Sequence, residues 1–204
     1  MITVLLDKAE FEYDIHSLVK AFYPKEEVYV STKDKEKKEE PVHYHMDVQF
    51  APEEIIFFWK WVEASEENAN QTGITKCVAV DYTNRKETKN SLKRTLYRLL
   101  SEYTGVELPW GNLTGIRPTK IPMALLEEGK SEEEIARYMK ETYFTSDEKI
   151  KLSIEIAERE LELLHKLDYE EGYSLYIGIP FCPTTCLYCS FTVSYTHLTL
   201  PTIA

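Results

Sequence analysis

Three cysteines within eight residues are the part of this sequence with the clearest chemical potential. Cys182, Cys186 and Cys189 have C-x3-C-x2-C spacing and directly follow residues 173–180, a β-branched and aromatic run that predicts a strand. Thiolates are soft ligands that suit zinc or iron–sulfur clusters. Structural zinc usually takes four ligands from paired C-x2-C knuckles, and the sequence has no second knuckle. The spacing therefore favours a cubane cluster with one open iron over a zinc loop or chance clustering.

The other reactive side chains form no comparable group. His43 and His45 lie on the polar side of a predicted strand at 42–50, and we expect surface histidines there because no cysteine or carboxylate partner is in view. Cys77 alternates within an apolar strand and is expected to be a small buried hydrophobe. Arg117 stands between Ile and Pro, where hydrogen bonding to loop carbonyls is favoured over binding of an anion.

Overall composition excludes several classes of protein. The chain has 204 residues, 43% of them hydrophobic, and a net charge of −11. Such an acid excess argues against a protein that grips a nucleic-acid backbone. No run of about 20 apolar residues is present, which predicts no membrane span. The N-terminus lacks a basic region and a small-residue cleavage site, so we expect a cytoplasmic protein.

The elements before the cysteines fall into two kinds. The first hundred residues predict an α+β domain, with strands at 2–6, 28–30, 42–50 and 74–82 and helices at 11–22 and 87–103. Residues 54–63 fit either a second hairpin strand or a helix. After a turn-rich string with two Pro and two Gly at 108–120, helices are expected at 119–128, 131–142 and 145–166. Capping-box patterns begin at Ser131 and Thr145.

Charge marks a boundary near residue 171. All Asp, Glu, Lys and Arg residues lie at or before Glu171, and none occurs from Gly172 onward. We therefore predict four parts: an N-terminal α+β domain at 1–105, a helical connector at 106–170, the start of a further domain at 171–192, and a tail at 193–204. The fold class is α/β overall.

The cysteine motif with its surroundings resembles a known family. C-x3-C-x-aromatic-C after a strand resembles the radical S-adenosylmethionine (radical SAM) enzymes. The string from Tyr176 to Phe191, YIGIPFCPTTCLYCSF, is similar to the oxygen-independent coproporphyrinogen III oxidase (dehydrogenase) group. Within that group, LTGIRPTK at 113–120 is similar to the HemZ-like branch. The resemblance covers residues 1 to about 192 and is most specific at 108–120 and 173–191.

This resemblance implies a cofactor set and a fold. Cys182, Cys186 and Cys189 would ligate three irons of a 4Fe–4S cluster, and S-adenosyl-L-methionine would chelate the fourth. Tyr188 matches an aromatic position near the adenine, and Tyr176 matches a tyrosine that approaches the same cosubstrate. The fold implied is a partial (β/α) barrel with the cluster loop after its first strand. That position agrees with the rule that barrel chemistry lies at the carboxyl ends of strands.

The implied reaction is the oxidative decarboxylation of coproporphyrinogen III to protoporphyrinogen IX in haem biosynthesis. A deoxyadenosyl radical would take hydrogen from a propionate side chain, which then loses CO₂. An electron donor is required and is not identified, and no catalytic residue beyond the cofactor ligands is assigned. The best-studied oxidases carry His and a fourth cysteine where this chain has Gly178 and Phe191. A haem chaperone-like radical SAM protein that binds haem is therefore the alternative, and a non-catalytic binding module is a third interpretation.

A barrel needs more chain than follows the cysteines. Only fifteen residues come after Cys189, and the uncharged stretch at 193–204 has no helical stripe. We expect an N-terminal fragment whose last residues are a non-native tail. Such a fragment should be inactive by itself, because the rest of the barrel and the porphyrin pocket are missing.

Overall fold

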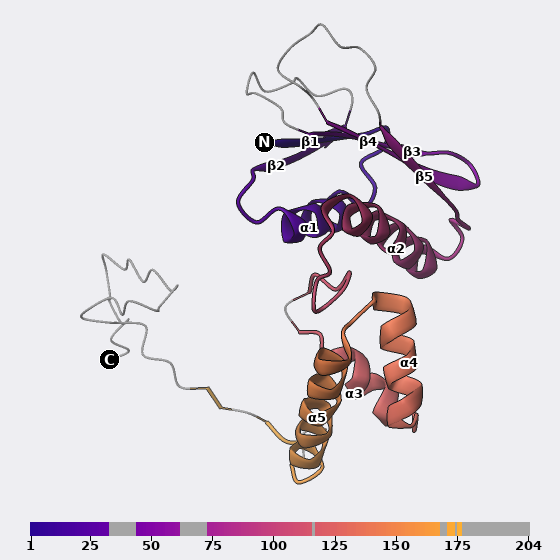
Figure 1. Cartoon of the computed structure of the whole chain (residues 1–204). Helices are drawn as coiled ribbons and strands as arrows, with labels where there is room; N and C mark the ends of the chain where they lie inside the picture. Colours follow the sequence, from indigo (N-terminus) through magenta and orange to yellow (C-terminus); the bar gives the residue numbers. More distant parts are fainter. Residues whose placement is uncertain (33–43, 62–72, 116, 168–170, 174, 177–204) are drawn as a thin grey trace, which may run out of the picture. The chain divides into compact units, whose positions relative to one another are not determined.

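In the computed structural model, residues 1–32, 44–61, 73–115, 117–167, 171–173, 175 and 176 are described, and within them five strands and five helices form (Figure 1). The chain divides into two compact units, Met1–Leu163 and Leu164–Ala204, which are described separately. No helix of the described residues has the length and hydropathy needed to cross a bilayer. The mixed α/β class predicted from sequence is confirmed, whereas the predicted domain boundaries stay predictions.

The strands form one mixed sheet with the order β2-β1-β3-β4-β5. Their bounds are β1 Ile2–Leu6, β2 Val28–Thr32, β3 Tyr44–Phe50, β4 Glu54–Trp61 and β5 Ile74–Ala79. Strand β1 is parallel to both β2 and β3, while β4 is antiparallel to β3 and β5. Residues 42 and 43 of the predicted third strand, His43 among them, lie outside the described part.

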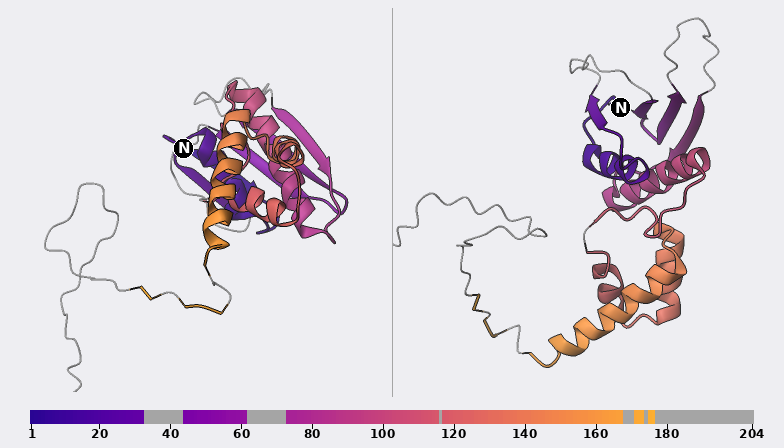
Figure 2. Two further views of the ribbon diagram at one scale, coloured as in Figure 1. Left: turned by 90° about the horizontal axis from the view of Figure 1, so that it is seen from below. Right: turned by 60° about the vertical axis from the view of Figure 1, so that its left-hand side comes forward.

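Helices α1 (Glu12–Phe22) and α2 (Arg85–Thr104) cover the same face of this sheet, as the views in Figures 1 and 2 show. The alternating apolar residues of the strands point toward these helices, which places the main core between the two layers. Its fully buried large side chains include Ile2, Leu6, Met46, Ile55, Phe57 and Trp59 from the sheet and Ile15, Leu18, Leu92, Leu96, Leu99 and Leu100 from the helices. Helix α2 ends at Thr104 and is capped by Gly105, which has a left-handed φ of 69°.

Strand pairing resolves the ambiguous segment and corrects one expectation. Residues 54–61 form β4, which pairs antiparallel with β3 so that Ile55, Phe57 and Trp59 face the helices. Cys77 pairs with Ile56, on the opposite face of the sheet, and it is exposed. The prediction that Cys77 is buried was therefore wrong, because β5 buries only one of its two faces.

Three further helices form a second core. These are α3 (Lys120–Glu127), α4 (Glu132–Tyr143) and α5 (Asp147–Leu164), all near their predicted positions. Ile135, Met139, Ile150 and Ile154 are buried between α4 and α5, with Leu113 and Leu125 packed against them. The apolar faces of α4 and α5 thus pack against one another.

Side-chain caps set where α4 and α5 begin. Ser131 and Glu134 form the predicted capping box, with the Glu134 N–H donating to Ser131 Oγ at 3.3 Å and the Ser131 N–H to Glu134 Oε2 at 2.9 Å. For α5 the expected cap was Thr145, and this was wrong. Ser146 Oγ accepts from the Lys149 N–H at 3.4 Å, whereas Thr145 is buried.

Replacing Ser131 with alanine is expected to lower the free energy of unfolding by about 1 kcal/mol, because the Glu134 N–H in the first turn of α4 loses its acceptor, Ser131 Oγ. Chemical denaturation followed by circular dichroism measures the change. Ser131→Thr keeps the hydroxyl and serves as the control. Equal losses in both variants would show that the box contributes nothing.

Candidate functional site

The residues with predicted cofactor roles lie almost entirely beyond the described part of the chain. Cys182, Cys186, Cys189 and Tyr188 are outside it, and so is most of the predicted strand at 173–180. Tyr176 is described; its side chain is 91% exposed and its backbone has no regular secondary structure. Within the described ranges, no group of three or more His, Cys, Asp or Glu residues could hold a metal ion.

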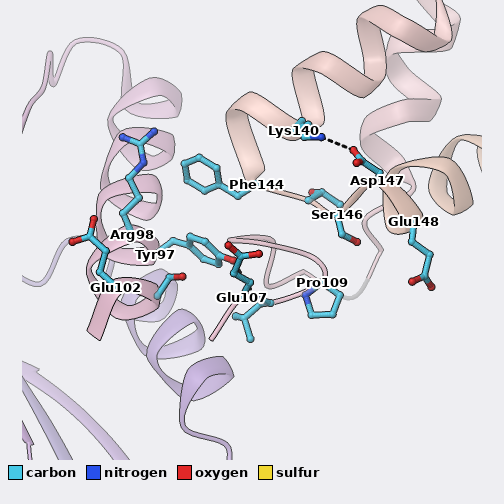
Figure 3. A pocket seen from close by; sticks show the side chains of 13 residues that line it. Tyr97, Arg98, Glu102, Glu107, Pro109, Lys140, Phe144, Ser146, Asp147 and Glu148 are labelled. Atoms are coloured by element: carbon cyan, nitrogen blue, oxygen red, sulfur yellow. Dashed lines mark hydrogen bonds and ion pairs between the residues drawn. The ribbon is translucent and has the colours of Figure 1, made fainter. Parts of the chain in front are cut away.

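A cleft of about 700 Å³ lies between the C-terminal half of α2 and the turn that joins α4 to α5 (Figure 3). The first residues of the 108–120 string form part of its wall. The cleft is lined by Tyr97, Arg98, Ser101, Glu102, Glu107, Leu108, Pro109, Lys140, Phe144, Thr145, Ser146, Asp147 and Glu148. Among the described residues, this cleft is therefore the candidate binding region. It adjoins the 108–120 string, one of the two most specific parts of the family resemblance.

Two stacked rings form the apolar part of this cleft. Tyr97 and Phe144 have ring centroids 5.3 Å apart, and the Arg98 guanidinium lies 5.0 Å from the Phe144 centroid. The Tyr97 hydroxyl accepts a hydrogen bond from the Leu108 N–H at 3.1 Å. Burial raises the pKa of Tyr97, so this phenol stays protonated at neutral pH. Phe144 has a left-handed φ of 57° as it ends α4.

Charged groups line the rest of the cleft without forming a catalytic arrangement. Lys140 Nζ lies 2.7 Å from Asp147 Oδ1, which joins α4 to the start of α5. Thr145 is buried, and its hydroxyl has no hydrogen-bond partner among the described residues. The lining contains two basic and four acidic residues. The cleft can pack a ring and form hydrogen bonds, but its described groups include no nucleophile paired with a base.

Two candidates from the sequence have partners that the sequence did not indicate. The predicted absence of a carboxylate beside His45 was wrong, because Asp47 Oδ2 lies 3.2 Å from its Nε2 and both side chains are largely buried. Arg117 was expected to bond loop carbonyls. Instead its guanidinium lies 3.2 and 3.3 Å from the two carboxylate oxygens of Glu160 on α5.

Lys93 is a buried ionisable residue that the sequence analysis missed. It is only 7% exposed on α2, and its Nζ donates to Thr114 Oγ1 at 3.1 Å. Burial lowers its pKa from the usual 10.5 to about 8. The signal was present, since position 93 lies three and seven residues before the buried Leu96 and Leu100.

The amino-acid sequence was compared with protein-family models and with the sequences of known proteins. No family model matches the chain. It is 42% identical over 121 residues to the oxygen-independent coproporphyrinogen-III oxidase-like protein HemZ of Bacillus subtilis (strain 168). The match covers 57% of this chain and 24% of HemZ, so the chain spans about a quarter of the relative's length. The predicted resemblance is confirmed at this level: over 121 residues the chain is similar to a HemZ-type oxygen-independent coproporphyrinogen-III oxidase-like protein.

Proposed function

We propose that this chain is part of a radical SAM oxidoreductase of haem biosynthesis that decarboxylates coproporphyrinogen III to protoporphyrinogen IX. The observation that carries the proposal is the C-x3-C-x2-C spacing of Cys182, Cys186 and Cys189. The 42% identity to HemZ, whose printed name describes it as coproporphyrinogen-III oxidase-like, supports it. The substrate would be a tetrapyrrole, and an electron donor would be a required partner.

The three cysteines would hold a 4Fe–4S cluster, because their donor set consists of soft thiolates. When bound, the cluster supplies the single electron that cleaves S-adenosyl-L-methionine. Tyr188 and Tyr176 would hold the cosubstrate, and the hydroxyl of Tyr176 is open to a ligand because the side chain is 91% exposed. The protein's own contribution is to orient the reactants and to exclude water.

The cysteine assignment predicts a selective loss of iron. Anaerobic reconstitution of the chain with iron and sulfide should give a brown protein with roughly four irons per chain. Changing any one of Cys182, Cys186 or Cys189 to serine should remove most of the iron and the visible absorption. Cys77→Ser is the matched control, since Cys77 is exposed on the sheet and lies far from the motif in sequence. A colourless wild type that carries zinc would overturn the assignment.

Gly178 and Phe191 favour a second candidate, a haem chaperone-like protein, because they replace the His and the fourth cysteine of the best-studied oxidases. An anaerobic assay of a longer protein that contains this sequence separates the two functions. Release of CO₂ with vinyl formation supports decarboxylation, whereas tight haem binding without product supports the chaperone.

A further inference from the structure

We propose that the string at 108–120 is a joint that fixes helix α5 to the sheet-covering helix α2, with Arg117 as its positioning residue. The string connects α2 to α3 in sequence, yet its described residues contact α2, α4 and α5. It therefore brings together elements that lie far apart along the chain.

Contacts with α2 come first. The Leu108 N–H donates to Tyr97 Oη at 3.1 Å, and Lys93 Nζ donates to Thr114 Oγ1 at 3.1 Å. Both partners on α2 are buried, with Tyr97 6% and Lys93 7% exposed. These bonds hold both halves of the string against the helix that covers the sheet.

Contacts with the turn between α4 and α5 are made by main-chain and amide groups. Asn112 is 1% exposed; its N–H donates to the Tyr143 carbonyl at 2.8 Å, and its Nδ2 donates to the Thr142 carbonyl at 3.2 Å. The Ser146 N–H in turn donates to the Pro109 carbonyl at 3.0 Å. The end of α4 and the start of α5 are thus bonded to the same short stretch of the string.

Arg117 extends the joint to the far part of α5. One guanidinium nitrogen, Nη2, lies 3.2 Å and 3.3 Å from the two carboxylate oxygens of Glu160, four residues before α5 ends at Leu164. The two side chains are 53% and 33% exposed, and exposed ion pairs contribute little to stability. The pair does, however, link the end of the string to the far part of α5, well beyond the contacts at the start of that helix. Arg117 is therefore assigned to positioning rather than to stability.

The position of α5 has a consequence that rests on the proposed function. In sequence, α5 precedes the segment that carries the three cysteines, so under the proposed function a change in the ordering of α5 would act on that segment. Arg117 would then act on cluster chemistry through α5, without touching the cofactor.

Double electron–electron resonance, which measures the distance between two spin labels, tests the joint in this chain without any cluster. Spin labels replace Lys86 on α2 and Leu163 on α5, both exposed, in a background where the four native cysteines are serine. Arg117→Glu should broaden the label-to-label distance distribution at least twofold, and adding Glu160→Arg should restore it. Arg159→Glu breaks the exposed Arg159–Glu155 pair within α5 and should leave the width unchanged.

The outcomes separate the joint from the proposed function. An unchanged width in Arg117→Glu, no recovery in the charge swap, or equal broadening in Arg159→Glu would overturn the joint. In a longer protein that contains this sequence, Arg117→Glu should lower cluster-dependent activity about tenfold at unchanged iron content, and the swap should restore it. A wild type without that activity would refute the proposed function while leaving the distance result intact.

Discussion

Replacing Gly111 with alanine should lower the free energy of unfolding by about 2–5 kcal/mol. Gly111 has a φ of +56°, in the left-handed region that costs a residue with a Cβ atom about 1–2 kcal/mol. The added Cβ would also overlap the Tyr143 carbonyl oxygen and lie 2.6 Å from the Phe144 carbonyl carbon and oxygen. Backbone atoms cannot rotate away as a side chain can, so the turn between α4 and α5 would have to shift.

Two other glycines separate the cost of a left-handed backbone conformation from the cost of steric overlap. Gly105→Ala adds a Cβ at φ +69° with nothing within 4 Å, so only the conformational cost of about 1–2 kcal/mol remains. Gly115→Ala has open space and no positive φ, and its effect should be within about 0.5 kcal/mol. Urea denaturation of the three variants gives the order. If Gly111→Ala were no worse than Gly105→Ala, close packing of the string against the α4–α5 turn would be disproved.

Lys93→Met should stabilise the protein at neutral pH and remove a pH dependence that the wild type shows. The pKa of Lys93 is about 8 in the folded chain and near 10.5 when unfolded. Between these values the unfolded chain binds more protons, so raising the pH favours folding. Wild-type stability should thus rise by up to about 3 kcal/mol from pH 8 to pH 10.5 through this group alone.

Comparing the variant with the wild type isolates this effect from the tyrosines. Burial raises the pKa of Tyr23, Tyr97 and Tyr143, and these groups titrate alike in both proteins. At pH 7 Lys93→Met should be more stable by about 1–3 kcal/mol, and the difference should shrink toward pH 10.5. Lys86→Met, on the exposed side of α2, is the control. If the difference in unfolding free energy between Lys93→Met and the wild type did not change with pH, burial would not lower the pKa of Lys93.

Local signals in the sequence were sufficient for most elements. Alternation over residues 44–50 gave a strand with Met46, Val48 and Phe50 inward, and the Ser131–Glu134 pattern gave the start of α4. These features depend on neighbours within a few residues, which the sequence displays directly. The C-x3-C-x2-C motif is local as well, but it lies outside the described residues, and the cofactor set that the family resemblance attaches to it stays a prediction.

Contacts between distant segments decided the rest. Cys77 and Phe57 both alternate in apolar strands, but only the layering of α1 and α2 on one sheet face determines that Phe57 is buried and Cys77 exposed. Arg117 meets Glu160 across 43 residues, and Lys93 meets Thr114 across 21. No local pattern encodes such pairs, because the free energy of a long-range contact depends on which surfaces the whole fold brings together.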